Sequence, residues 1–252
     1  MIIKNTEELK ILRDGGKRLH DILMQVVSRV VPGIKTIELD VLAEELILKQ
    51  GGMPAFKGYK TYDATSSYPA TLCTSINDEV VHGIPGEREL QEGDIIGLDI
   101  GMQFGGLFTD TAVTVPVGNI DQFYQKLIDT TREALMLGIK EARAGARLGD
   151  IGHAIQSHSE AAGFSVVKEL VGHGVGRKVH EEPEIPNWGE RGTGAVLKEG
   201  MVIALEPMLN EKGDCVKLAE DGWTYVTYDG SRSAHFEHTI VVTKNGAEII
   251  TQ

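Results

Sequence analysis

The chain has 252 residues, of which 41% are hydrophobic and 25% charged, a composition typical of a globular protein that buries a core. Its formal net charge of −12 at pH 7 argues against general affinity for nucleic-acid phosphates, and no run approaches the roughly 18 apolar residues that cross a membrane. Cys73 and Cys215 are the only cysteines and lack metal-ligand spacing, so, with no signal-peptide pattern near the first residue, we expect a reduced, cytoplasmic location.

The first part of the chain carries two helix patterns. Asn5 and Glu8 have capping-box spacing, and apolar residues recur at helical intervals over residues 9–30, up to a stop at Pro32-Gly33. A second helix is predicted over Thr36–Lys49, because glycines follow its last apolar positions.

The next pattern is a hairpin that carries two aspartates. Residues 94–103 and 107–115 are predicted to be strands joined at Gly105-Gly106, a two-residue turn signal. If the strands pair across that turn, side-chain alternation places Asp99 and Asp110 on one face as diagonal neighbours, with Cβ atoms about 7 Å apart or less. Two carboxylates at that separation can hold a metal ion. The alternative is a pair of solvated acids on an exposed face of the sheet.

The remainder of the chain repeats the plan of the first part. Two more helices are predicted over residues 121–163. The run that leads to Asp99 is similar to the run that leads to Glu206, at an offset of 107 residues. The repeat predicts a duplicated helix–helix–strand unit, and hence a single catalytic domain built from related halves at about 1–118 and 119–252.

Two histidines and two further acids follow in the second part. The glycines of residues 172–176 allow close backbone approach and a projecting imidazole at His173, and His180 follows seven residues later. A phosphate-binding loop is not indicated, because the strand–loop–helix context is missing. Glu206 ends one β-rich run and Glu237 begins another. Taken singly these residues are ordinary, but with the two aspartates they make four carboxylates and one imidazole, a hard donor set that suits manganese, iron or cobalt.

Several motifs occur in order along nearly the whole chain. They are residues 75–85 (SINDEVVHGIP), Asp99 with Asp110, residues 172–176 (GHGVG), 180–183 (HEEP), 203–208 (IALEPM) and 233–239 (SAHFEHT). Together they resemble the type I methionine aminopeptidases of the pita-bread metallopeptidase superfamily, M24. The resemblance implies an α+β pita-bread fold, with pseudo-twofold duplicated units and a central antiparallel sheet covered by helices.

The resemblance also implies a set of site residues. Two divalent metal ions, cobalt, manganese or iron with zinc also compatible, would be bound by Asp99, Asp110, His173, Glu206 and Glu237. Asp110 and Glu237 would bridge the ions, and Glu206 would act as general acid and base. His82 and His180 would contact the substrate and stabilise the transition state. Tyr68, Cys73 and Trp223 would line the pocket for the methionine side chain.

The implied reaction is removal of the initiator methionine from nascent polypeptides whose second residue is small, through attack by a metal-bridging water. The expected partner is the nascent N-terminus, and family membership alone indicates docking at the ribosome near the exit tunnel. We expect a monomer with no membrane partner and no direct nucleic-acid recognition. One alternative is a peptidase of the prolidase or aminopeptidase P type, which shares the ligands but carries a preceding domain. Another is a non-catalytic binding module, which would lack ligands that are intact here.

The sequence departs from the family pattern at three places. The stretch over residues 60–67 is longer than expected and borders the specificity pocket. Val179 stands where bacterial members carry an aromatic residue, and we hypothesise that the smaller side chain widens the methionine pocket. His235 replaces an expected glutamine, with a role that the sequence leaves open.

Overall fold

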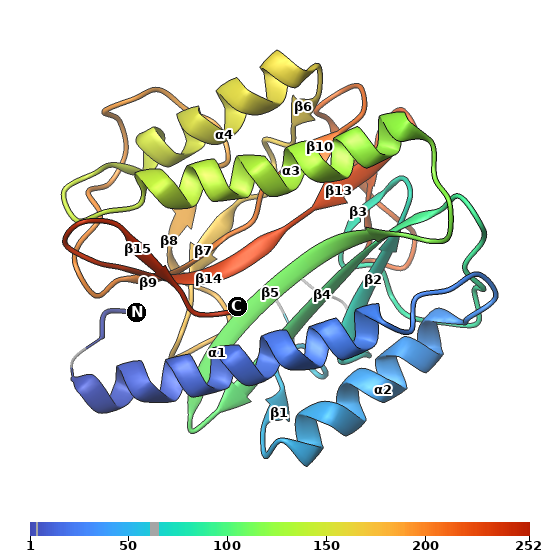
Figure 1. Cartoon of the computed structure of the whole chain (residues 1–252), viewed down its shortest axis with the longest axis horizontal. Coiled ribbons are helices and arrows are strands. Elements are labelled where there is room, and N and C mark those ends of the chain that lie inside the picture. The colour runs from blue at the N-terminus through green and yellow to red at the C-terminus, as the bar shows by residue number, and fades with distance from the viewer. Residues whose placement is uncertain (4, 61–65) are drawn as a thin grey trace.

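A large antiparallel sheet forms the centre of the molecule, and long helices cover one of its faces (Figure 1). The structure is a computed structural model that describes residues 1–3, 5–60 and 66–252. Within these residues, nine strands form the large sheet, in the order β1-β4-β5-β14-β9-β7-β8, with β2 also paired to β4 and β15 to β14. Two small sheets, β13-β10-β6 and β11-β12-β3, flank it.

The helices and strands have the following bounds. The helices are α1 (Thr6–Val27), α2 (Thr36–Lys49), α3 (Gln122–Glu141) and α4 (Leu148–Ala162). The strands of the large sheet are β1 (Met53–Pro54), β2 (Leu72–Ile76), β4 (Ile95–Phe104), β5 (Leu107–Pro116), β7 (Gly172–Gly174), β8 (Glu181–Ile185), β9 (Val202–Leu205), β14 (Glu237–Val242) and β15 (Ala247–Ile249). The small sheets contain β3 (Glu79–Val81), β6 (Ser165–Val166), β10 (Met208–Asn210), β11 (Val216–Leu218), β12 (Tyr225–Thr227) and β13 (Ser233–His235).

Helix α1 begins where the sequence predicts and ends earlier. The Asn5 side chain accepts a hydrogen bond from the Glu8 N–H at 2.9 Å, which caps the first turn. The predicted continuation through residue 30 is wrong, because α1 ends at Val27. The next turn tightens, with the N–H of Val30 donating to the carbonyl of Val27. The residue before Pro32 is also disfavoured in a helix.

The repeated segments make matching backbone contacts. Gly33 and Gly145 both have φ of 89°, a left-handed conformation that glycine adopts without strain. The N–H of Gly33 donates to the carbonyl of Leu90 at 2.7 Å, and the N–H of Gly145 donates to that of Leu197 at 2.9 Å. Each helix pair is therefore tied in the same way to the segment that leads into its strand.

The long hairpin forms in the predicted register. Phe104 pairs with Leu107, which sets Asp99 opposite Ala112 and Asp110 opposite Gly101. The strands run one residue beyond the prediction, to Phe104 and to Pro116. The pairing confirms that both aspartates lie on one face of the sheet.

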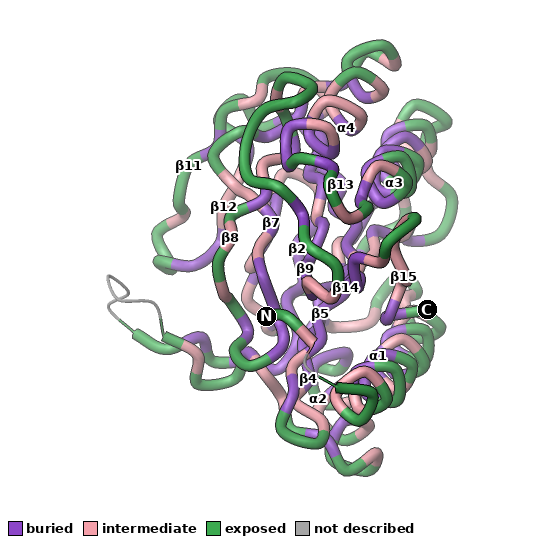
Figure 2. Tube along the Cα trace, turned by 90° about the vertical axis from the view of Figure 1, so that its left-hand side faces the viewer, coloured by how far each residue is buried: buried purple, intermediate pink, exposed green. Residues whose placement is uncertain are grey.

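The hydrophobic core lies between the helices and the sheet. One buried cluster joins α1 and α2 to β2 and β4, and a second joins α3 and α4 to β9 and β14. Figure 2 shows buried strands in the middle of the molecule, with the helices to one side and the partly exposed β11–β12 hairpin to the other. In the described part of the chain, no helix is long and apolar enough to cross a membrane. The face of the sheet turned away from the helices carries the predicted acids.

Candidate active site

Three adjacent strands bring the first three acids together. Asp99 lies on β4 and Asp110 on β5. Glu237 begins β14 and pairs with Ala112 of β5, whose other neighbour across the sheet is Asp99. The small Ala112 side chain therefore has a carboxylate on each side. Asp110 lies two residues from Ala112 along β5 and shares its face.

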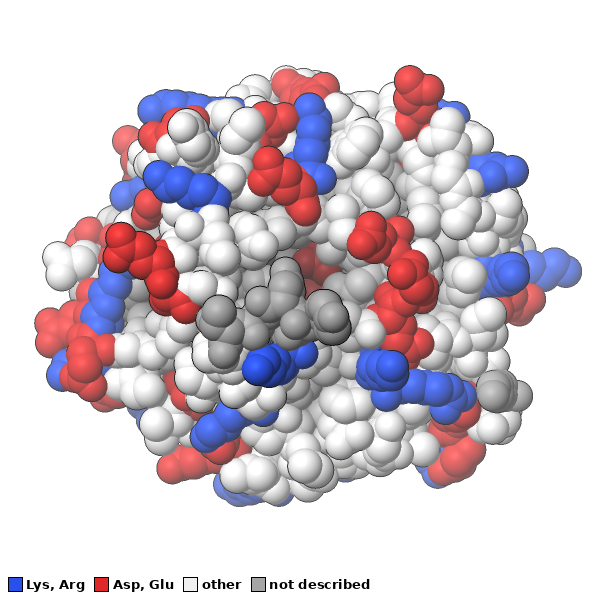
Figure 3. Space-filling model, turned by 180° about the vertical axis from the view of Figure 1, so that it is seen from behind, with Lys and Arg blue, Asp and Glu red and all other residues white. Residues whose placement is uncertain are grey.

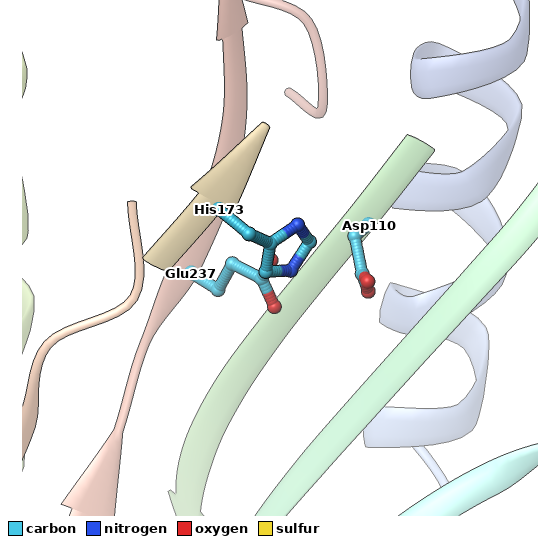
Figure 4. A group of neighbouring side chains, drawn as sticks. All are labelled: Asp110, His173 and Glu237. Atoms are coloured by element: carbon cyan, nitrogen blue, oxygen red, sulfur yellow. The ribbon is translucent and has the colours of Figure 1, made fainter. Parts of the chain in front are cut away.

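The remaining predicted ligands come from strands beyond β14. His173 on β7 pairs with Ala204 of β9, and Glu206 follows β9 directly. His173 Nε2 lies 3.3 Å from Oε1 of Glu206. One candidate ligand atom from each of Asp110, His173 and Glu237 lies within 4.8 Å of the other two, and Figure 4 shows these side chains pointing toward one another. The sheet thus gathers acids from both parts of the chain around one imidazole.

The four carboxyl groups are buried together, which disfavours their charged forms. Burial raises the pKa of Asp99 to about 7. Burial, followed by the charges of neighbouring acids, raises the pKa of Asp110, Glu206 and Glu237 well above ordinary values. One oxygen of each of these four groups is buried without a hydrogen-bond partner among the described residues. Buried unpartnered oxygens are costly, and a divalent cation would satisfy them. The donor set therefore fits a hard divalent metal.

Burial has the opposite effect on the histidines, whose charged form is the protonated one. It lowers the pKa of His82 and His173 to about 4. The pKa of His180 is lowered as well, through partial burial of its ring and the nearby His173, although the residue as a whole is exposed. The close contact of His173 with Glu206 is therefore made by a neutral ring rather than by an ion pair. A neutral imidazole offers one lone pair to a metal and one N–H to a substrate.

Local backbone geometry positions His82 and His180. His82 has a φ of 59°, in the left-handed region that few bulky residues adopt. Gly83 follows, and a Cβ there would lie 2.2 Å from a backbone oxygen of β2, so the chain passes β2 too closely for any other residue. His180 directly precedes β8, and its Nδ1 lies 2.7 Å from the hydroxyl oxygen of Tyr59.

An apolar wall stands beside the acids. Tyr68, Cys73 and Trp223 are buried and pack in one cluster with Phe56, Ala70 and Val179. The rings of Tyr68 and Trp223 meet edge to face, with centroids 5.4 Å apart. Cys73 pairs with Asp99 across β2 and β4, which places the wall next to the carboxylates. Aromatic rings and a thiol suit an unbranched thioether side chain, which needs few hydrogen bonds.

All ten predicted site residues line one cavity, whose volume is about 80 Å³. This cavity adjoins a wider groove of about 730 Å³, because His82, His173, His180 and Glu206 line both. Figure 3 shows a hollow in the face opposite the helices, with acidic side chains along one margin. The wider groove leaves room for a longer chain whose first residue occupies the small cavity.

Three further residues at the site were not assigned a role from the sequence. Phe56 and Tyr59 also line the cavity, but they follow β1 in a segment without helix or strand periodicity, so no local pattern marks them. His235 lies on β13, and its Nε2 is 4.0 Å from Oε2 of Glu206. Most of the long stretch predicted to border the pocket, residues 61–65, lies outside the described residues.

The chain is similar to known proteins over its full length. A model of metallopeptidase family M24 matches residues 10–244. The methionine aminopeptidase of Clostridium perfringens is 48% identical over 251 residues, which cover 100% of this chain and 98% of that relative. The crystal structure of the methionine aminopeptidase of Thermotoga maritima has a TM-score of 0.94 at 46% identity and covers 100% of both chains.

The fold is also similar to that of a peptidase of the prolidase type, which the sequence left open as an alternative. The Xaa-Pro dipeptidase of Bacillus anthracis is 23% identical with a TM-score of 0.77, and this chain covers 62% of it. At that identity the likeness shows the fold alone. The full-length agreement with the Thermotoga maritima structure confirms the predicted pita-bread α+β fold.

Proposed function

Because this chain belongs to metallopeptidase family M24, we propose that it is a methionine aminopeptidase that removes the initiator methionine from nascent polypeptides with a small second residue. The observation that carries this proposal is the single small cavity, which has four acids and an imidazole on one side and the wall of Tyr68, Cys73 and Trp223 on the other. A substrate methionine whose thioether side chain packs against that wall would place the peptide bond that follows it next to the acids.

We propose that the five ligand candidates, Asp99, Asp110, His173, Glu206 and Glu237, would hold two divalent ions, manganese, iron or cobalt. The four unpartnered carboxylate oxygens support this assignment. When bound, such ions lower the pKa of a water and polarise the scissile carbonyl. Neutral His173 supplies its lone pair without first losing a proton, because its pKa is about 4.

The protein's own side chains then move protons and position the substrate. In its carboxylate form, Glu206 at the cavity wall accepts a proton from the attacking water and returns it to the leaving amine. His82 and His180 are neutral at pH 7 and can donate N–H groups to the carbonyl oxygen as negative charge develops there. The Tyr59 hydroxyl, donating to Nδ1 of His180, would leave the His180 proton on Nε2, free to face the substrate.

We further propose that the chain is one catalytic domain built from halves at about 1–118 and 119–252. The matching hydrogen bonds of Gly33 and Gly145 support the duplication. We place the protein in the cytoplasm as a monomer that acts near the ribosomal exit tunnel. The two free cysteines support the reduced, cytoplasmic location, and the family resemblance alone supports action near the ribosome.

Peptide hydrolysis after metal reconstitution tests the proposed function. Under anaerobic conditions with manganese, iron or cobalt, a Met-Ala-Ser peptide should release free methionine, and the matched Met-Leu-Ser peptide should remain intact. Cleavage only of Xaa-Pro peptides would instead establish the prolidase type of activity. Absence of turnover with every metal would favour a non-catalytic binding module.

A further inference from the structure

The wider groove beside the cavity offers a path for the peptide beyond its first residue. Its inner end is formed by His82, His173, His180 and Glu206, which also line the cavity. From there it follows β7 and β8, past Gly172 on β7. A peptide held by its first residue in the cavity must leave through an adjoining opening, and this groove is continuous with the site.

One wall of the groove carries two acids that the catalytic site does not use. Glu182 and Glu184 on β8 line the groove, and both are exposed. No ion pair or hydrogen bond joins either side chain to another described residue. The neighbouring Glu181 differs, since it accepts hydrogen bonds from the backbone N–H groups of Arg177 and Lys178.

Two cations, Arg177 and Lys178, also line the groove. Arg177 is paired with Glu8 at 2.7 Å, so its charge is already compensated. Lys178 is exposed and precedes His180 by two residues. The same groove presents the two exposed carboxylates of Glu182 and Glu184.

We propose that Glu182 and Glu184 form a subsite that binds basic side chains of the substrate downstream of the scissile bond. This inference rests on the proposed aminopeptidase function and specifies its preferred substrates. Both acids line the groove that is continuous with the cavity. A peptide that leaves the cavity along this groove therefore brings its residues downstream of the scissile bond past the two carboxylates.

Matched peptides test this subsite. We compare kcat/KM for Met-Ala-Ser-Lys-Gly-Lys and Met-Ala-Ser-Gln-Gly-Gln, each followed by the same neutral tail, and for a third peptide that carries the lysines at the end of that tail. Each exposed charge pair should raise kcat/KM by about 1.5- to 5-fold. The preference for the first peptide should fall in high salt, which screens exposed charges.

Isosteric variants separate the subsite from the general negative charge of the protein. In the Glu182→Gln/Glu184→Gln variant, the lysine preference should disappear while the glutamine peptide keeps its kcat/KM. Glu45→Gln removes an exposed acid on α2, away from the groove, and should preserve the preference. Equal turnover of all three peptides, or a preference that survives in the double variant, would overturn the subsite alone. Failure to cleave any Met-Ala peptide would overturn the proposed function as well.

Discussion

Replacing Glu237 by glutamine should stabilise the metal-free protein and remove its response to metal. Glu237 is buried beside three other acids, and burial followed by the charges of Asp110, Glu206 and Asp99 raises its pKa well above the ordinary value of 4.5. One Glu237 oxygen has no hydrogen-bond partner among the described residues. The amide of glutamine carries no charge and can donate to a neighbouring carboxylate, so Glu237→Gln removes a destabilising group at nearly constant volume.

The size of the effect follows from the cost of burying a polar group without a partner. An unsatisfied buried donor or acceptor costs about 1–3 kcal/mol, and a charged group costs more. For Glu237, which has one unpartnered buried oxygen, we expect an effect of about 2–3 kcal/mol. Because the folded pKa is raised, the parent loses stability as pH rises above about 4.5. The advantage of Glu237→Gln should therefore be small at pH 5 and larger at pH 8.

Thermal unfolding in a chelating buffer measures this difference. At pH 8, Glu237→Gln should melt about 4–12 °C above the parent, at about 2–4 °C per kcal/mol for a protein of this size. Added manganese should raise the melting temperature of the parent and have little effect on the variant. Glu45→Gln on α2 serves as the control for loss of one negative charge. A Glu237→Gln protein no more stable than the parent at pH 8 without metal would refute the reasoning.

Four further substitutions test separate parts of the site. His82→Ala and His180→Ala should each lower kcat by about 100- to 1,000-fold and leave the amount of bound metal unchanged. If elemental analysis showed that a variant had lost metal, that histidine would not act on the substrate alone. Val179→Phe should narrow the methionine pocket and alter selectivity between methionine and norleucine peptides. The larger side chain should also lower the stability of the protein by about 1–3 kcal/mol. Unchanged selectivity would show that Val179 does not form part of the pocket wall. Thr239→Val removes two hydrogen bonds between the Thr239 hydroxyl and the backbone of Asp110, at 2.9 and 2.8 Å. Urea unfolding should show a loss of about 1–3 kcal/mol, and an unchanged midpoint would show that this link contributes nothing.

Local sequence predicts those parts of the site that depend on short-range geometry. The register of Asp99 and Asp110 could be derived because a two-residue turn fixes the pairing and strands alternate with a period of two. The position of Glu237 beside them could not, since it depends on pairing between β5 and β14, and no local pattern specifies which strands become neighbours. Glu237 was predicted to be a metal ligand from the family resemblance, because the periodicity of the sequence does not place it beside the two aspartates.

The aromatic residues of the cavity show the same limit more clearly. The hydrogen bond between Tyr59 and His180 joins residues 121 positions apart, and the Tyr59 segment has no periodic pattern. At the C-terminus of α1 the sequence predicted too much rather than too little. Apolar residues at helical spacing continue to residue 30, whereas the helix ends at Val27. The spacing of apolar residues indicates which face of a helix is buried, whereas the position where the helix ends depends on the residues that follow it.

The distribution of ligands along the chain has a consequence for synthesis on the ribosome. Asp99 and Asp110 are translated early, whereas Glu237 is reached only after β5, β7 and β9 have been made. A growing chain can complete the β4–β5 hairpin long before the strand that closes the ligand set has emerged. Until then, any ion held by the hairpin would have an incomplete coordination sphere. Metallation and peptidase activity should therefore be late events in biogenesis, triggered by the docking of β14 between β5 and β9.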